Sequence, residues 1–76
     1  MTSKLPQIKA KDLIRIALKL DFKFDRQSGS HAIYYRKSDK RRIVIPVHHS
    51  KDIKPKTLLG IISDMGLKKD EFRKLL

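Results

Sequence analysis

The sequence predicts an α+β fold in which a three-stranded antiparallel sheet carries helices on one face. Helices are predicted near both ends of the chain, because apolar residues recur at helical spacing over residues 9–20 and again after Pro55. Three strands are predicted between these helices, because three short apolar or alternating stretches are separated by turns that contain Gly, Ser and Asp. The order α-β-β-β-α(-α) places the helices on one face of the sheet and leaves the other face open to a ligand.

The first helix is predicted over residues 9–20. Its apolar face is expected to hold six side chains: Leu13, Ile14, Ile16, Ala17, Leu18 and Leu20. Lys11, Arg15 and Lys19 recur at every fourth position and form a basic stripe on another side of the helix. Asp21 is a suitable stop for the helix, because Asp tolerates a left-handed backbone better than most residues.

Three strands are predicted, over residues 22–26, 31–37 and 41–47. The first alternates apolar and charged residues, and it is therefore expected to be half-buried. Gly29 permits a tight turn into the second strand, because glycine adopts a positive φ without steric cost. Pro46 indicates that the third strand lies at an edge of the sheet or ends there.

A polar loop over residues 48–54 leads to a second long helix, which begins at Pro55 and is capped by Gly66. The apolar face of this helix is expected to comprise Leu58, Leu59, Ile61, Ile62 and Met65. A short last helix is predicted over residues 69–75. Its inward side chains are expected to be Phe72, Leu75 and Leu76.

The length and charge of the chain restrict its class. Its 76 residues fit one domain, 1–76, with residues 1–8 as a loose lead-in. Without Cys, neither a disulfide nor a thiolate zinc site can form. No apolar run approaches the ~20 residues of a membrane span, so we expect a cytoplasmic protein with no membrane partner. The formal charge of +11 favours a polyanionic partner, which means nucleic acid, an anionic membrane surface or an acidic protein.

His31 is the most chemically distinctive residue, because it opens the second strand directly after the turn at Gly29 and Ser30. RNA carries its own nucleophile, the 2′-hydroxyl group. A protein that cleaves RNA must remove this proton, stabilise charge on phosphorus and assist the leaving 5′-oxygen. Imidazole exchanges a proton near neutral pH, which suits the first task. A lone His is more often structural, and strand alternation leaves open which face of the sheet His31 occupies.

Basic side chains lie on both sides of this turn in the sequence, and they suit RNA phosphates. The candidate RNA-binding residues are Arg26, Gly29, Ser30, Arg36, Lys37, Arg41, Arg42 and His48, with Lys11 and Arg15 of the first helix. A cluster of Lys51, Lys54 and Lys56 fits phosphate as well. Tyr34 and Tyr35 either stack on unpaired bases or fill the core. A second acid–base group, if there is one, has His48 and Tyr34 as candidates.

Metal and cofactor sites are not expected. His48 and His49 are the obvious pair, but adjacent side chains in an extended chain point in opposite directions and do not readily share an ion. A phosphate contact or simple solvation is the better prediction for both.

An ordered set of short motifs runs through the chain from residue 9 to residue 76. It comprises Arg26-Gln27, Gly29-Ser30-His31, Tyr34, Arg42-Ile43-Val44-Ile45-Pro46-Val47-His48, Lys54-Pro55 with Thr57-Leu58, and Met65-Gly66-Leu67 with Glu71-Phe72. This set resembles the HicA toxin family. Departures at Lys9-Ala10, Asp21 and Lys68 concern the ends of helices and leave His31 and its turn intact.

The resemblance implies a double-stranded-RNA-binding-domain-like fold and the toxin of a bacterial or archaeal toxin–antitoxin pair. It implies a metal-independent endoribonuclease that cleaves mRNA, depends on His31 and so inhibits translation and growth. It also implies a HicB-type antitoxin that covers the His31 site. No DNA binding is expected of the toxin alone, since repression of its operon would come through the antitoxin.

Two other functions remain open at this point. One is a non-catalytic RNA-binding domain of the same fold, in which His31 only contacts a phosphate. The other is an interaction protein whose basic surface binds an acidic partner and no nucleic acid.

Overall fold

A computed structural model describes residues 7–47 and 51–76 of the chain. The observed order confirms the predicted α+β fold, and it is consistent with the topology of a double-stranded-RNA-binding domain. The elements are α1 (Ala10–Lys19), β1 (Lys23–Ser28), β2 (His31–Arg36), β3 (Arg41–Pro46), α2 (Pro55–Asp64) and α3 (Lys69–Lys74). None of the helices in the described ranges is long and apolar enough to cross a membrane.

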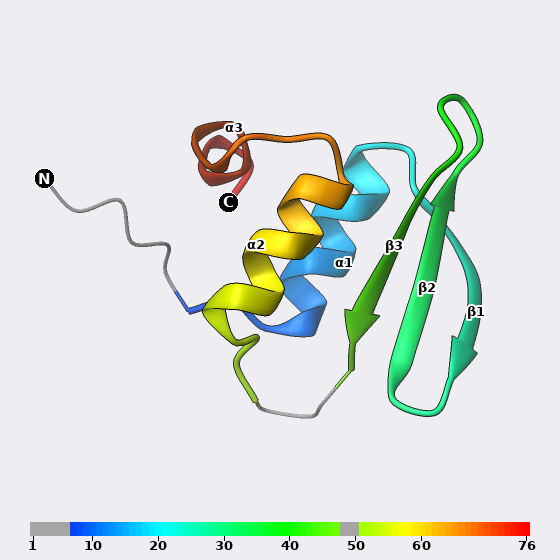
Figure 1. The fold of residues 1–76 in the computed structure, drawn as a ribbon, viewed down its shortest axis with the longest axis horizontal. Coiled ribbons are helices and arrows are strands. Elements are labelled where there is room, and N and C mark those ends of the chain that lie inside the picture. Colours follow the sequence, from blue (N-terminus) through cyan, green and yellow to red (C-terminus); the bar gives the residue numbers. More distant parts are fainter. Residues whose placement is uncertain (1–6, 48–50) are drawn as a thin grey trace, which may run out of the picture.

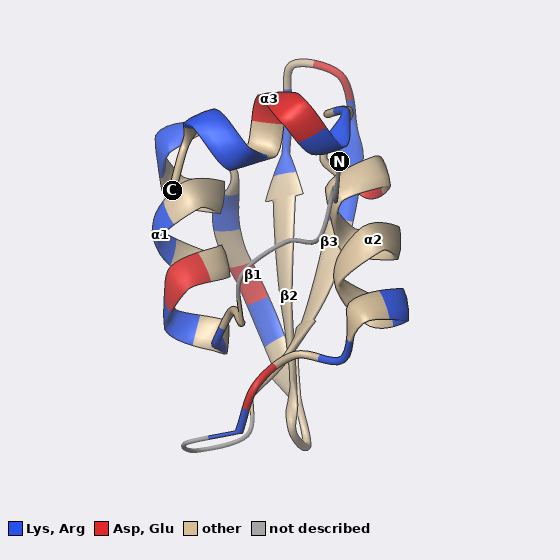
Figure 2. Ribbon diagram, turned by 90° about the vertical axis from the view of Figure 1, so that its left-hand side faces the viewer, with Lys and Arg blue, Asp and Glu red and all other residues tan. Residues whose placement is uncertain are grey.

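The molecule has two main layers, a sheet and a pair of helices (Figure 1). The strands follow the order β1-β2-β3, and both pairings are antiparallel. Helices α1 and α2 cover one face of the sheet, and α3 lies across them on the side away from the strands (Figures 1 and 2). The opposite face of the sheet, hereafter the outer face, carries no helix.

The core lies between the sheet and the two long helices. It contains Leu13, Ile16 and Ala17 of α1, Ala32, Tyr34, Ile43 and Ile45 of the sheet, and Leu58, Ile61 and Ile62 of α2. Met65 and Phe72 extend this core to α3. The fully buried positions in each long helix follow an i, i+3, i+4 spacing, which brings them onto one narrow stripe.

Three predicted core residues are exposed instead. Leu18, Leu59 and Leu76 keep 55%, 44% and 45% of their surface exposed. Each residue of an α-helix is rotated about 100° from its neighbour, so Leu59 lies well away from the stripe through Leu58, Ile61 and Ile62. Leu18 is displaced from the α1 stripe for the same reason, and Leu76 follows the end of α3. The predicted apolar faces were therefore too wide.

The first strand differs from its prediction. Instead of a half-buried strand over residues 22–26, β1 begins at Lys23 and all of its residues are exposed. Phe22 is fully buried just before it. The pairing with β2 is offset between Phe24 and Arg26, so Asp25 forms a bulge. This strand is an edge of the sheet and lies farthest from the helices (Figure 1), which explains its exposure.

The predicted loose lead-in is wrong at its last residue. Ile8 is buried, and its carbonyl oxygen accepts a hydrogen bond from the Ile53 N–H at 2.7 Å. A bridge between Lys9 and Asp52 continues this contact, and their side chains form an ion pair at 3.0 Å. The segment that precedes α2 is therefore fixed against the start of α1.

Candidate functional site

His31 lies at one end of the sheet, in the middle of three paired strands. Its partners are Ser28 on β1 and Pro46 on β3. The preceding turn has Gly29 at a φ of +58°, and the Gln27 side-chain amide donates to its carbonyl oxygen at 3.1 Å. The Val47 N–H donates to the Ser30 carbonyl oxygen at 2.6 Å, which extends the pairing past His31. The backbone around the imidazole is therefore held on both sides.

The strand register answers the question of the face. Ala32 and Tyr34 are buried toward the helices, so alternation assigns His31 to the outer face with Ile33 and Tyr35. The His31 side chain is exposed. Tyr34, a candidate for the second acid–base group, instead lies against the core with 7% of its surface exposed. The structure thus separates these two side chains onto opposite faces.

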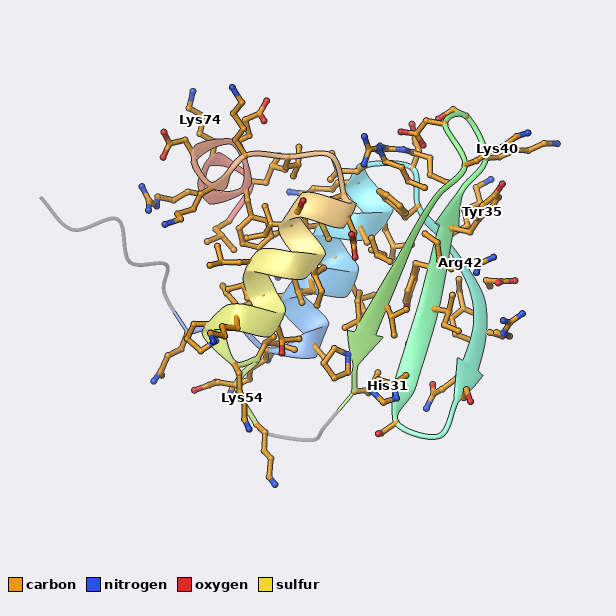
Figure 3. All side chains as sticks on the ribbon, in the orientation of Figure 1. His31, Tyr35, Lys40, Arg42, Lys54 and Lys74 are labelled. Atoms are coloured by element: carbon orange, nitrogen blue, oxygen red, sulfur yellow. The ribbon has the colours of Figure 1, made fainter. Side chains whose placement is uncertain are left out.

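A hollow of about 290 Å³ adjoins Pro46, the β3 partner of His31. Its lining residues are Pro46, Lys51, Asp52, Ile53, Lys54 and Thr57. Figure 3 shows His31 and Lys54 at the same end of the molecule. The hollow therefore lies at the same end of the molecule as His31 and reaches the start of α2.

The start of α2 suits an anion. Lys54 is the N-cap residue, makes no side-chain cap and precedes Pro55 at the first helical position. The N–H groups of a helix's first turn have no intrahelical acceptor and carry partial positive charge. The ribbon of α2 shows Lys or Arg only in this first turn (Figure 2). This end of the helix, with Lys51, Lys54 and Lys56, can hold a phosphate group.

Lys11 and Arg15 lie on the exposed side of α1. Arg15 forms an ion pair with Asp12 at 3.2 Å. Lys11 is closer than Arg15 to the start of α1, where Lys9 pairs with Asp52, a residue that lines the hollow. RNA binding by Lys11 and Arg15 stays a prediction.

Arg26 and Arg42 lie on the outer face, paired with Ile33 and Tyr35 respectively. Arg26 approaches Asp25 at 3.9 Å. Arg42 and Lys37 form no ion pair within residues 7–47 and 51–76. Lys37 is exposed in the turn after β2, at the end of the sheet opposite His31.

Arg36 and Arg41 belong to a separate group at that opposite end, which we term the arginine cluster (Arg36, Asp39 and Arg41). Arg36 binds both carboxylate oxygens of Asp39, at 3.0 and 2.8 Å, and Arg41 Nε binds Asp39 at 3.0 Å. The hydrogen bond from Arg36 lowers the pKa of Asp39 from 3.8 to about 2. The same hydrogen bond raises the pKa of Arg36.

The arginine cluster also joins the ends of both long helices. Arg36 donates to the carbonyl oxygens of Leu20 and Met65, at 2.8 and 3.3 Å, and Arg41 donates to that of Asp64 at 3.3 Å. The Arg36 guanidinium also lies over the Phe22 ring, 4.4 Å from its centroid. These two arginines are thus engaged in holding helices to the sheet, and the structure does not bring them together with His31.

A metal ion in a protein needs several donor side chains that converge on one point. Among the residues that the structure describes, no group of three His, Asp or Glu side chains is arranged to hold a metal ion. His48 and His49 lie outside the described residues.

Sequence reasoning did not name Lys23 or Thr57 as site residues. Lys23 shares the outer face with Tyr35 through the β1 register. Thr57 borders the hollow in the first turn of α2. The bulge at Asp25 shifts the strand pairing, so the face that Lys23 occupies could not be predicted from alternation. Thr57 could have been found, because it lies three residues after the N-cap, in the first turn of α2.

A family model described as the HicA toxin of bacterial toxin–antitoxin systems matches residues 10–67. No curated protein matches the chain. The matched range begins at the first residue of α1, contains the whole sheet with the Gly29-Ser30-His31 turn, and ends just after α2. This range is well over half of the chain, and the chain therefore belongs to the HicA toxin family.

Proposed function

We propose that this toxin is a metal-independent endoribonuclease that cleaves mRNA with His31 as its acid–base group. The observation that carries the proposal is the position of His31: exposed at the sheet end, on a backbone held by both neighbouring strands, and paired with Pro46, which lines the hollow at the start of α2. Cleavage of mRNA by the toxin would stop translation and growth.

The proposed reaction uses the nucleophile that RNA itself supplies. His31 accepts the proton of a 2′-hydroxyl group, and the oxygen attacks the adjacent phosphorus. The bond from phosphorus to the 5′-oxygen breaks, and this oxygen leaves with a proton from water or from a second protein group. The products are a 2′,3′-cyclic phosphate and a 5′-hydroxyl end. A positioned imidazole of this kind contributes about 10²- to 10⁴-fold to the rate.

Phosphate binding is assigned to the surface beside His31. The first-turn N–H groups of α2 and the side chains of Lys51 and Lys54 supply positive charge along one wall of the hollow. Positive groups aimed at the phosphorus oxygens stabilise the charge that develops during the attack. Lys11 extends this basic surface onto α1.

The test is cleavage of a defined RNA in the presence of EDTA. Wild-type protein is expected to cleave, and His31→Ala is expected to lose at least about 100-fold in rate while it retains its fold and its affinity for RNA. Lys74→Ala, an exposed residue of α3, serves as the matched control and should cleave like wild type. Replacing the 2′-hydroxyl at the cleavage position by hydrogen should abolish cleavage there.

Two results would contradict the proposal. If neither wild type nor His31→Ala cleaves while both bind RNA, the chain is a non-catalytic RNA-binding domain of the same fold. If His31→Ala cleaves as fast as wild type, the acid–base group lies elsewhere.

Membership of a toxin–antitoxin family implies an antitoxin partner. We propose that this partner is a HicB-type protein and that it masks the His31 end of the sheet. The charge of +11 favours an acidic surface on the partner. On complex formation, cleavage should cease, and the amides of residues 29–33 and 51–57 should gain protection from hydrogen exchange. Protection confined to α3 would contradict this placement.

A further inference from the structure

The outer face of the sheet is basic and aromatic, and the helices leave it uncovered (Figure 1). Cross-strand pairing arranges its side chains in three rows: Lys23–Tyr35–Arg42, Arg26–Ile33–Val44 and Ser28–His31–Pro46. None of these rows contains an acidic residue. His31 therefore shares one surface with two arginines, a lysine and a tyrosine.

A second hollow adjoins the row at the far end of this face from His31. Its volume is about 380 Å³, and its lining residues are Asp21, Lys23, Phe24, Asp25, Tyr35, Arg36, Lys37 and Ser38. This volume is within the usual range for sites of small organic groups, about 300–1,000 Å³. Phe24 pairs with Tyr34 and packs edge-on against its ring at 5.7 Å, so it lies on the helix side of β1, whereas Figure 3 shows Tyr35 and Arg42 on the side of the sheet away from the helices.

We propose that the outer face binds single-stranded RNA, with an unpaired base stacked on Tyr35 where its ring lines this hollow. The phosphates of the same strand lie along Arg42, Lys23 and Arg26. This inference deepens the proposed function and rests on it in one respect, since it takes His31 as the place where the strand is cut.

The spacing along β2 fits one continuous strand of RNA. Four residues separate His31 from Tyr35, which corresponds to ~13 Å along a β-strand. Stacked nucleotides advance ~3.4 Å each along one strand, so this length spans about four nucleotides, or fewer when the RNA is extended. A base held at Tyr35 therefore positions a phosphate at His31 only a few nucleotides away.

An unpaired strand fits this surface better than a duplex. In an RNA duplex the bases are stacked on one another, and their edges lie in grooves that flat aromatic side chains do not enter. The ring of Tyr35 can stack only on a base that has left such a stack.

The charges of the hollow favour RNA over an acidic polypeptide. Asp21 and Asp25 line it with carboxylates, which repel phosphates and acidic side chains alike, so the hollow suits an uncharged group such as a base. The same carboxylates accept hydrogen bonds from the amino groups of bases. The surrounding rows still attract the phosphates, because their charged members are Lys23, Arg26 and Arg42.

The proposal is tested by measuring the binding of a labelled single-stranded oligoribonucleotide. The same strand annealed to its complement is measured beside it. The His31→Ala background keeps the RNA intact. Tyr35→Ala is expected to weaken single-strand binding by about tenfold and to leave duplex binding unchanged. Arg42→Ala should reduce the salt dependence of single-strand binding by about 0.7 in logarithmic slope. Leu59→Ala, an exposed apolar residue on α2, is the matched control.

Tyrosine fluorescence provides a second measurement that does not depend on the stability of Tyr35→Ala. The chain has two tyrosines and no tryptophan, so Tyr35 is the only emitter in Tyr34→Phe. A base stacked on Tyr35 should quench this emission as single-stranded RNA saturates the protein. Unchanged emission at saturation would overturn the proposal.

The outcomes separate this inference from the proposed function. If wild type cleaves RNA but Tyr35→Ala keeps both Kd and KM, the outer face does not bind the substrate and His31 catalysis stands. If wild type does not cleave RNA but Tyr35→Ala weakens single-strand binding, the outer face binds RNA and the ribonuclease proposal fails. If Tyr35→Ala and Arg42→Ala keep their affinity for RNA and lose affinity for the antitoxin, the outer face binds protein and the inference is wrong.

Discussion

The two ends of the sheet use positive charge in opposite ways. At one end, Arg36 and Arg41 are bonded to Asp39 and to carbonyl oxygens at the ends of α1 and α2. At the other end, His31 is exposed, and Lys51 and Lys54 border a hollow. Charge that is fully hydrogen-bonded stabilises a fold, whereas charge that faces water is available to a ligand.

This contrast shows why the net charge alone does not locate a binding surface. Arg36 and His31 are both in β2, five residues apart, yet only 17% of the Arg36 side chain is exposed. The guanidinium has a planar set of donors that can satisfy several acceptors at once. In this toxin, those acceptors are carbonyl groups that helix ends would otherwise leave without partners.

The largest effect on stability is expected from Arg36→Ala. The variant loses hydrogen bonds to Asp39, Leu20 and Met65 and the contact with the Phe22 ring, so the free energy of unfolding should fall by about 2–4 kcal/mol. Urea denaturation followed by circular dichroism measures this change. Lys37→Ala, its exposed neighbour, should change stability by less than about 0.5 kcal/mol. A loss below about 1 kcal/mol for Arg36→Ala would break the comparison.

The two turn glycines provide the next largest effect. Gly66 has a φ of +84°, and a Cβ there would lie 3.0 Å from the Arg41 Cζ and Nε atoms. Gly29 has a φ of +58° with nothing within 4 Å of such a Cβ. Gly29→Ala should therefore cost only the left-handed backbone, about 1–2 kcal/mol, and Gly66→Ala more.

The double substitution isolates the contact with the arginine cluster. In an Arg41→Ala background, Gly66→Ala should cost about as much as Gly29→Ala, because the guanidinium is gone. Equal costs for the two glycines in the wild-type background would show that Arg41 moves aside freely.

A smaller effect, dependent on pH, is expected from Asp39→Asn. Because the folded protein lowers the pKa of Asp39 to about 2, the carboxylate stabilises the fold above its ordinary value of 3.8. This contribution is lost as the pH falls through about 2. The stability gap between wild type and Asp39→Asn should be constant near neutral pH and narrow from about pH 4 to about pH 2. A gap that does not change over this range would contradict the role given to the hydrogen bond from Arg36.

Much of the fold could be predicted from the sequence because its signals are local. Helix periodicity, the turn at Gly29, the stop at Asp21 with its φ of +70° and the start at Pro55 all depend on residues near one another. The misplaced apolar residues, Leu18 and Leu59, lie at the margins of an apolar stripe. Only the packing of the helices against the sheet decides those margins.

The site was less predictable because it depends on register. The sequence identified His31 but did not decide its face, which the burial of Ala32 and Tyr34 settles. Asp39 is three residues from both Arg36 and Arg42 and so does not distinguish them, and the carbonyl acceptors of Arg36 are 16 and 29 residues away. The bulge at Asp25 likewise fixes which β1 residues share the outer face.

The smallest effect on stability is expected from His31→Ala. The His31 side chain is exposed, and the hydrogen bond that holds this end of the sheet, from Val47 to Ser30, is made by the backbone alone. The free energy of unfolding should change by less than about 0.5 kcal/mol, while cleavage falls by at least about 100-fold. Denaturation and cleavage measured on the same preparations of His31→Ala and Arg36→Ala make the comparison direct. If His31→Ala is destabilised as much as Arg36→Ala, its loss of cleavage reflects unfolding. The exposed end of the sheet is then a second structural anchor instead of a reactive site.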